Sequence, residues 1–252
     1  EPYTEPVPVY PTAHYAMGGV PTNITTEVLR NNTDVVRGLY AAGEVACVSV
    51  HGSNRLGTNS LLDINVFGKR AGVAAAEYAV NASFVDMPED AAAATVAELE
   101  AMRSRPDGER VADLRRELQE SMDRGAQVFR TEASLTETLA VVKDLQKRYG
   151  RVSVQDKGRL FNTDLLEAVE LGFLLDLAEV VVVGALERKE SRGGHFREDY
   201  PDRDDANFMV HTMAYRRGDA EAVDAAGIPP HEIRLEPKPV VVTRYQPMER
   251  KY

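Results

Sequence analysis

Two basic side chains near the N-terminus could bind a small anionic ligand. Arg55 lies in the glycine-flanked segment HGSNRLG of residues 51–57. A loop there would leave its guanidinium free to donate two hydrogen bonds to one carboxylate. His14 lies four residues before Gly18 and Gly19, where the missing side chains would let a ligand approach the backbone. Alone, a loop arginine is usually a solvated charge and a single histidine a structural residue.

Two further features are typical of a bound dinucleotide. Glu44 ends the segment GLYAAGE of residues 38–44, whose apolar run predicts a short buried strand. At the carboxyl end of such a strand, a carboxylate can accept a hydrogen bond from a ribose or ribityl hydroxyl. Ser60 and Leu61 follow Asn59 at a predicted helix start, whose unpaired N–H groups carry partial positive charge. That charge could face the pyrimidine edge of a flavin, although an ordinary Asn or Ser cap would explain these residues alone.

The elements that must position these residues are expected within residues 1–86, a region rich in glycine, threonine and asparagine. After the predicted strand, a loop leads through Asn54. A helix then begins at Asn59 or Ser60 and continues through Ala79, with apolar positions that fit a buried helix. These positions are Leu62, Val66, Ala71, Val73 and Ala74.

Residues 87–190 change to a helical pattern. Apolar residues spaced by about three and four positions predict one amphipathic helix. They are Val111, Leu114, Leu118, Met122 and Phe129. Ser134 and Glu137 form a capping-box pattern at the start of a second helix. Polar turns at residues 106–108 and 149–150 complete the expected antiparallel bundle.

A long apolar helix is expected over residues 164–190, with Asn162 or Thr163 as its N-cap. Residues 191–252 then begin with a charged loop and continue into two expected strands, residues 207–215 and 240–245. Prolines exclude helix from most of this tail. They are Pro229, Pro230, Pro237 and Pro239. The sequence therefore predicts an α+β fold with three domains: residues 1–86, 87–190 and 191–252.

Composition excludes several classes of protein. The 252 residues carry a formal charge of -10 and a pI near 5.1, which argues against a nucleic-acid partner. No apolar run reaches the roughly 20 residues that span a bilayer. The single cysteine, Cys47, excludes an intrachain disulfide, and no metal site is predicted. The chain opens without methionine at Glu1, which suggests that it is part of a longer polypeptide.

Several long motifs in a fixed order resemble the flavoprotein subunit of succinate dehydrogenase and fumarate reductase. They are PTAHYAMGG at 11–19, GLYAAGE at 38–44, HGSNRLGTNSLLD at 51–63, ESRGGHFREDYPDRDD at 190–205 and TRYQPMERKY at 243–252. The resemblance covers essentially the whole chain and is greatest to bacterial succinate dehydrogenase. It implies that this chain is the C-terminal part of such a subunit.

The resemblance implies a role for each candidate residue. His14 and Arg55 match the positions that hold the substrate carboxylates. Glu44 matches the acid at the FAD ribityl or ribose hydroxyls, and Ser60 and Leu61 match the helix start whose backbone reaches the flavin ring. The expected fold is then the closing part of a two-dinucleotide-type FAD-binding domain, a helical bundle and a small β-containing C-terminal domain.

Other parts of the family's site are expected upstream. These are the glycine-rich turn for the ADP part of FAD, the histidine that carries FAD covalently and the proton-donor arginine, so no catalytic residue is assigned here. The expected reaction is succinate oxidation with hydride transfer to FAD. Expected partners are the upstream part of the flavoprotein, an iron-sulfur subunit and membrane anchor subunits. Together they would hold the chain peripherally at the cytoplasmic side of the bacterial inner membrane.

Three alternatives stay open on sequence alone. Fumarate reductase catalyses the reverse reaction, and the direction depends on redox potential and quinone. L-aspartate oxidase is a relative with similar His-Tyr and Asn-Arg segments that needs no electron-transfer partner. A third possibility, from another class, is a fragment that acts only as a structural module of the complex.

Overall fold

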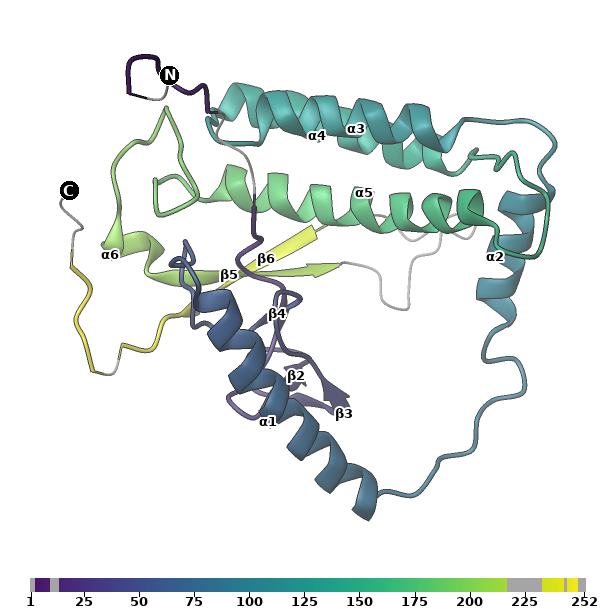
Figure 1. Ribbon diagram of the computed structural model, residues 1–252, viewed down its shortest axis with the longest axis horizontal. Helices are drawn as coiled ribbons and strands as arrows, with labels where there is room; N and C mark the ends of the chain where they lie inside the picture. Colours follow the sequence, from purple (N-terminus) through teal and green to yellow (C-terminus); the bar gives the residue numbers. More distant parts are fainter. Residues whose placement is uncertain (1–2, 10–13, 217–232, 243, 249–252) are drawn as a thin grey trace. The chain divides into compact units, whose positions relative to one another are not determined.

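The computed structural model describes residues 3–9, 14–216, 233–242 and 244–248 (Figure 1). The chain forms two units: unit 1 comprises Glu1–Ala91 with Arg192–His195, and unit 2 comprises Ala92–Ser191 with Phe196–Tyr252. Helices and strands are mixed along the chain, which confirms the predicted α+β class. The division into three domains stays a prediction.

Unit 1 holds two small sheets and one long helix. β1 (Val20–Pro21) pairs in parallel with β4 (Ala46–Cys47), and β2 (Glu27–Leu29) pairs in antiparallel with β3 (Val35–Tyr40). The helix α1 (Asn59–Asn81) packs against β3. A Cβ at Gly38 would stand 2.9 Å from the ring of Tyr78, so this glycine permits close helix–strand packing.

The prediction of a short buried strand through Glu44 was wrong at its end and in its burial, since Leu39 is 50% exposed. β3 stops at Tyr40, and Glu44 lies in a turn between β3 and β4. Gly43 adopts φ +79°, and the Ala46 amide donates to the Gly43 carbonyl at 2.9 Å. The chain therefore turns at this glycine instead of extending the strand.

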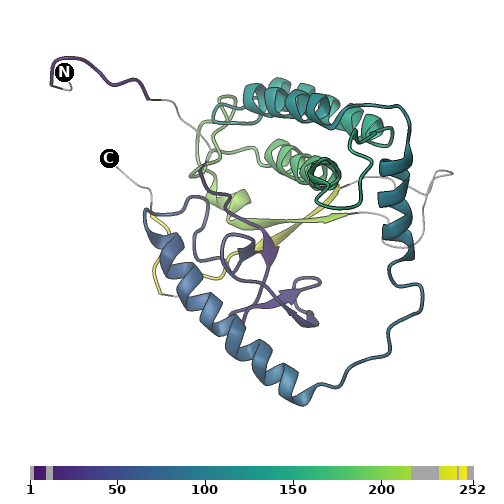
Figure 2. The same cartoon turned by 45° about the vertical axis from the view of Figure 1, so that its right-hand side comes forward.

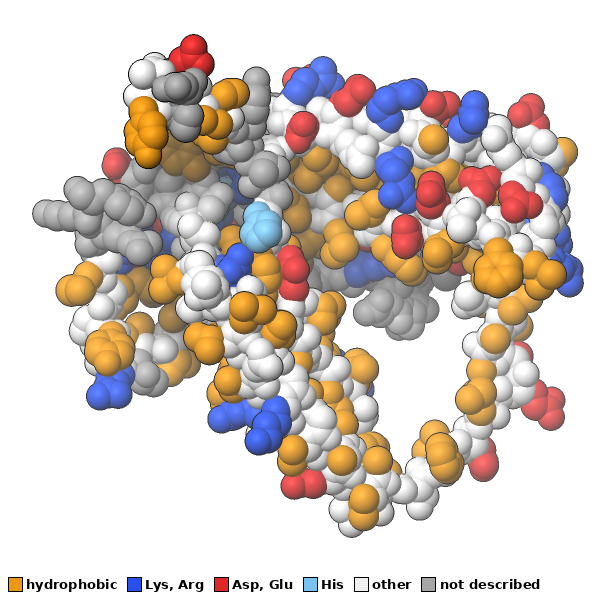
Figure 3. Space-filling model, in the orientation of Figure 1, with side chains coloured by type: hydrophobic (Ala, Val, Ile, Leu, Met, Phe, Trp, Pro, Cys, Tyr) orange, Lys and Arg blue, Asp and Glu red, His pale blue; other side chains and the backbone are white. Residues whose placement is uncertain are grey.

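α1 begins at Asn59 as predicted, but neither Asn59 nor Ser60 is its N-cap. The N-cap is Thr58, in a left-handed conformation with no side-chain cap hydrogen bond. The predicted buried apolar face was also wrong for this chain, since Leu62 and Val73 are 63% and 51% exposed. Figure 3 shows apolar side chains on the surface of this helix. Within α1, only Asp63 and Phe67 are buried.

Unit 2 is built around three long helices with a continuous apolar core. α3 (Val111–Gly125) and α4 (Glu132–Tyr149) lie side by side on α5 (Thr163–Glu187), as Figures 1 and 2 show. Leucines at helical spacing are fully buried between them, including Leu114, Leu145 and Leu171. A shorter helix, α2 (Ala93–Ser104), was not predicted and places Met102 in the same core.

The helix starts in unit 2 show which local signals were interpreted correctly. Asn162 caps α5, because its side chain accepts a hydrogen bond from the Leu165 amide at 2.8 Å. The capping box predicted from Ser134 and Glu137 was placed one turn too late. Thr131 is the N-cap of α4, and its side chain and that of Ser134 accept from each other's amides. α3 ends at Gly125, before Phe129.

The C-terminal part of unit 2 adds a hairpin. The short α6 (Asp205–Phe208) precedes β5 (Val210–Arg216), which pairs in antiparallel with β6 (Ile233–Pro239). The strand predicted at 240–245 was therefore placed too late in the chain. Pro237 and Pro239 fit β6 because both strands of a two-stranded sheet are edges, where a missing N–H is tolerated. Among the described residues, no helix is both long and apolar enough to cross a bilayer.

One ion pair joins the ends of two helices in unit 2. Arg197 is fully buried and donates to the Ala185 carbonyl at the end of α5, 2.8 Å away. Its guanidinium also donates two hydrogen bonds to Asp199, at 2.7 and 2.8 Å. Asp199 in turn accepts from the Glu132 amide at the start of α4 at 2.7 Å. Each charge therefore lies at the helix terminus whose dipole favours it.

Replacing Asp199 with Asn should weaken unit 2 in a pH-dependent way. Hydrogen bonding from Arg197 lowers the pKa of Asp199 from 3.8 to about 2. Because the pKa is lower in the folded state, the carboxylate stabilises the fold above pH about 4, and this contribution disappears as the pH falls to about 2. Urea unfolding at pH about 6, 4 and 2.5 gives the free energy of unfolding of each protein. The difference in this free energy between wild type and D199N should shrink as the pH falls. The exposed Asp123→Asn, on α3, is the control, and a D199N gap that is independent of pH would contradict the assignment.

Candidate functional site

A buried carboxylate of α1 organises the loop that carries Arg55. The side chain of Asp63 is only 4% exposed, and its Oδ2 lies 3.0 Å from Nε2 of His51, whose side chain is 12% exposed. A buried carboxylate is costly unless it is hydrogen-bonded. Asp63 therefore ties His51, at the start of the loop, to the first turns of α1.

Tyr15 joins this pair to the predicted substrate residues. Its ring meets His51 edge-on, with the ring centroids 5.6 Å apart. Arg55 places its guanidinium carbon 4.5 Å from the centroid of the same Tyr15 ring, a cation–π arrangement. One guanidinium nitrogen donates to the Leu56 carbonyl at 3.2 Å, and the buried Nε has no partner among the described residues. The guanidinium of Arg55 is thus held by the Tyr15 ring on one face and by one hydrogen bond at its edge.

The surroundings of Tyr15 change its acidity. Burial raises the pKa of its hydroxyl above 10.0, and the negative charges of Asp63 and Glu44 raise this pKa further. Arg55 acts in the opposite direction, and a hydrogen bond to Asp63 adds to the increase. Tyr15 is therefore a neutral phenol at physiological pH.

His14 and Glu44 both lie beside Tyr15, His14 as its neighbour in the chain and Glu44 through a hydrogen bond from Ala16. His14 directly precedes Tyr15 and has an exposed side chain. The amide of Ala16 donates to Oε1 of Glu44 at 3.1 Å, so the exposed Glu44 side chain holds the backbone beside His14. The structure therefore brings the segments of His14, Glu44 and Arg55 together around Tyr15. That the side chains of His14 and Arg55 converge on one ligand stays a prediction.

The start of α1 lies close to Asp63 in the chain. Its amides are partly used within the chain, since Asn59 donates to the Leu56 carbonyl at 3.2 Å and Leu61 to the Thr58 carbonyl at 3.0 Å. The first amides of a helix keep their partial positive charge in such turns. The Leu61 side chain is 60% exposed. A helix start at this point agrees with the geometry expected for Ser60 and Leu61.

Sequence reasoning missed three residues of this cluster: Tyr15, His51 and Asp63. One signal could have found Asp63, because it is a lone acid between apolar residues in the helix pattern LLDINVF of residues 61–67. An acid at such a position must find polar partners. Tyr15 and His51 carried no comparable signal, since their positions depend on contacts between distant segments. Among the described residues, no group of His, Cys, Asp and Glu side chains is arranged to hold a metal ion.

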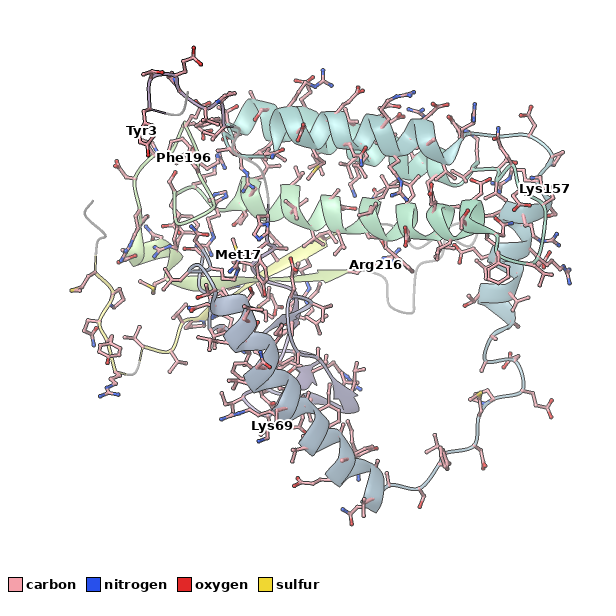
Figure 4. The ribbon with its side chains drawn as sticks, in the orientation of Figure 1. Tyr3, Met17, Lys69, Lys157, Phe196 and Arg216 are labelled. Carbon is pink, nitrogen blue, oxygen red and sulfur yellow. The ribbon has the colours of Figure 1, made fainter. Side chains whose placement is uncertain are left out.

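A turn from far along the chain also contacts the Arg55 loop. Residues Arg192–His195 belong to unit 1, although the sequence predicted them as part of the C-terminal domain. The Gly194 amide donates to the Ser53 carbonyl at 2.9 Å. A Cβ on Gly193 would stand 2.4 Å from Ser53 Oγ, and one on Gly194 would stand 3.4 Å from the methyl group of Met17 (Met17 is labelled in Figure 4). Gly193 is therefore needed for this close approach, whereas a Cβ at Gly194 would make only ordinary contact.

Comparison with known proteins agrees with the motifs. Residues 115–252 match the family described as fumarate reductase flavoprotein C-term, which is more than half of the chain. The chain belongs to the succinate dehydrogenase and fumarate reductase flavoprotein family. Residues 1–61 match the FAD binding domain family, so the cofactor of this region is FAD.

Succinate dehydrogenase and fumarate reductase subunits both align along nearly the whole chain. A succinate dehydrogenase flavoprotein subunit from Rickettsia bellii is 45% identical over 95% of this chain. A fumarate reductase flavoprotein subunit from Mycobacterium tuberculosis is 40% identical over 100% of it. The structure of E. coli quinol fumarate reductase matches 98% of the chain with a TM-score of 0.82 and 39% identity. The chain spans 39% and 42% of the two curated relatives and 40% of that solved chain.

Adding one methyl group at Gly193 should disturb the Arg55 loop. Gly193→Ala combines a left-handed φ of +60° with overlap onto Ser53, whereas Gly52→Ala has a similar φ of +62° and nothing within 4 Å. Backbone strain should cost each variant about 1 kcal/mol, and overpacking should cost G193A about 1–3 kcal/mol more. Thermal unfolding of the two variants measures the difference. Equal losses of stability in the two variants would show that a Cβ at residue 193 does not overlap with Ser53.

Proposed function

We propose that this chain supplies the C-terminal part of the dicarboxylate and FAD sites of a succinate-oxidising flavoprotein. The observation that carries the proposal is the seating of Arg55 on Tyr15, directly beside His14. A guanidinium held on an aromatic face has lost much of its freedom before a ligand arrives. It keeps N–H groups in the plane of the fork, which suits a carboxylate.

Arg55 and His14 would bind and orient the substrate. Arg55 donates paired hydrogen bonds to one carboxylate, and His14 donates from its exposed ring to the substrate's carboxylate region. Orientation of this kind can contribute on the order of 7–11 kcal/mol to lowering a barrier when the geometry is good. Succinate carries a carboxylate at each end, so the second is expected to meet residues outside this chain. The proton-donor arginine is expected there as well.

The residues at the proposed FAD side are of types that suit the cofactor. Glu44 has an exposed carboxylate, of which one oxygen holds the Ala16 amide, and the other can accept from a ribityl or ribose hydroxyl. Ser60 and Leu61 lie in the first turn of α1, where backbone N–H groups favour negative charge. FAD, when bound, supplies the hydride-accepting chemistry. The protein residues position it and polarise its surroundings.

We favour succinate oxidation over fumarate reduction because the motifs most resemble bacterial succinate dehydrogenase. Identity to relatives does not separate the two directions, since subunits named for each align at 40–45%. Electrons would leave through an iron-sulfur subunit, and membrane anchor subunits would hold the chain at the cytoplasmic side of the inner membrane. Solved relatives include a quinol-fumarate reductase with menaquinol molecules, which supports a quinone-linked complex. Turnover of the complete complex with succinate plus a quinone, and with fumarate plus a quinol, tests the direction.

Arg55→Lys should lower turnover without removing the flavin. Lysine keeps the positive charge but loses the planar fork and the stacking on Tyr15. We expect a loss of about 2–5 kcal/mol in transition-state binding, seen as a fall in both kcat and kcat/KM for succinate. Steady-state rates measured beside the flavin absorbance of the FAD-loaded complex provide the test.

The matched control for this prediction is Arg37→Lys. Arg37 also stacks on a tyrosine, with its guanidinium carbon 5.7 Å from the centroid of the Tyr78 ring, but it has no proposed role at the site. R37K should turn over succinate like the wild type. If R55K did the same with full flavin content, Arg55 would be an ordinary loop charge and the proposed substrate site would be wrong.

A further inference from the structure

We infer that Asp63 is a positioning residue that holds the substrate arginine in place through Tyr15 and His51. This inference rests on the proposed function of Arg55 and goes beyond it, because Asp63 has no proposed contact with substrate or cofactor. It assigns a task to a buried carboxylate that the binding of substrate and cofactor leaves unexplained. The contacts of Asp63 lead outward through two aromatic rings to Arg55.

Asp63 departs from the rest of α1 in both type and burial. Its side chain is 4% exposed, whereas the apolar neighbours Leu62 and Ile64 are 63% and 45% exposed. A sequence that exposes its leucine and buries its aspartate has inverted the usual preference. The inversion requires that the carboxylate have polar surroundings in the interior, and the structure supplies a hydrogen bond from His51 and the nearby hydroxyl of Tyr15.

The first partner is His51. A carboxylate hydrogen bond fixes the orientation of an imidazole ring and its tautomer. With Nε2 donating to Asp63 over 3.0 Å, the ring of His51 cannot rotate freely, and its orientation sets the edge-on contact with Tyr15. His51 is also the first residue of the loop that contains Arg55, so the same bond anchors that loop to α1.

The second neighbour is Tyr15, and the negative charge of Asp63 raises the pKa of its hydroxyl. The Tyr15 ring packs edge-on against His51, which Asp63 in turn holds by a hydrogen bond. The remaining ring surface carries Arg55, at 4.5 Å. Apart from this ring, the guanidinium is held by a hydrogen bond to the neighbouring Leu56 carbonyl. Moving or freeing the Tyr15 ring would therefore release the guanidinium from the position in which it can bind a carboxylate.

Asp63→Asn in the FAD-loaded complex tests the inference. The asparagine side chain is nearly the same size but carries no charge, so it weakens the charge-assisted hydrogen bond that orients His51 and, through that ring, Tyr15. Malonate is a suitable probe of binding, since it is a dicarboxylate with a single methylene and cannot be dehydrogenated to an alkene. We expect its Kd, measured by the change in flavin absorbance, and the KM for succinate to rise about tenfold. The kcat should change less, and the flavin content should stay that of the wild type.

A double-mutant cycle separates positioning from general loss of structure. If Asp63 acts through Arg55, the D63N change should weaken malonate binding much less in the R55K background than in the wild type. Tyr15→Leu, which removes the ring between them, should show the same non-additivity and decides the matter if D63N does not retain FAD. Asp63→Glu keeps the carboxylate and should restore part of the affinity. Glu77→Gln, at an exposed position of the same helix, should bind malonate like the wild type.

The possible failures are distinguishable. If R55K binds malonate and turns over succinate normally, the proposed substrate site is wrong and the positioning inference fails with it. If R55K is impaired but D63N and Y15L bind malonate with wild-type affinity, only the positioning inference is overturned. Full additivity in the cycle also overturns it, because Asp63 would then act independently of Arg55.

Discussion

The need to satisfy one buried carboxylate organises the N-terminal part of this protein. Asp63 enters the interior of unit 1 on a helix whose apolar residues are largely exposed. Its hydrogen-bond partner His51 and the Tyr15 ring that packs on His51 come from separate segments of the chain. Burial of a charge is tolerated only when its hydrogen-bonding capacity is met. His51, which meets it, and Tyr15, which packs on His51, are near in sequence to the residues proposed to bind substrate, so one local requirement shapes the whole site.

The two units solve the problem of stability differently. Unit 2 buries leucines at helical spacing in a continuous core and neutralises two helix ends with the Arg197–Asp199 pair. Unit 1 has few buried apolar residues in its described part, and polar contacts determine much of its arrangement. This contrast fits their proposed tasks, because a site for FAD and a dicarboxylate needs exposed polar groups held rigidly, whereas a helical bundle needs only to stay packed.

The sequence predicted best where the deciding interactions are local. The period of apolar residues and the Asn162 cap located α5, and the start of α1 was placed within one residue. Thr131 was missed as a cap because Ser134 offered an equally good local pattern one turn later. β6 was missed because its prolines argue against a central strand, and only the pairing with β5 shows that it is an edge. The motifs led to the segments of the site, but Tyr15 and the Gly193 turn depend on contacts that no local pattern encodes.

The Arg192–His195 turn has a consequence for how the protein is made. It belongs to unit 1, yet the chain on both sides of it belongs to unit 2. A ribosome therefore completes residue 55 about 140 residues before it completes the turn that supports Ser53, an interval on the order of ten seconds at about 5–20 residues per second. During that interval the nascent Arg55 loop lacks its backbone contact with Gly194. The site can reach its final form only after most of the helical bundle of unit 2 has been synthesised.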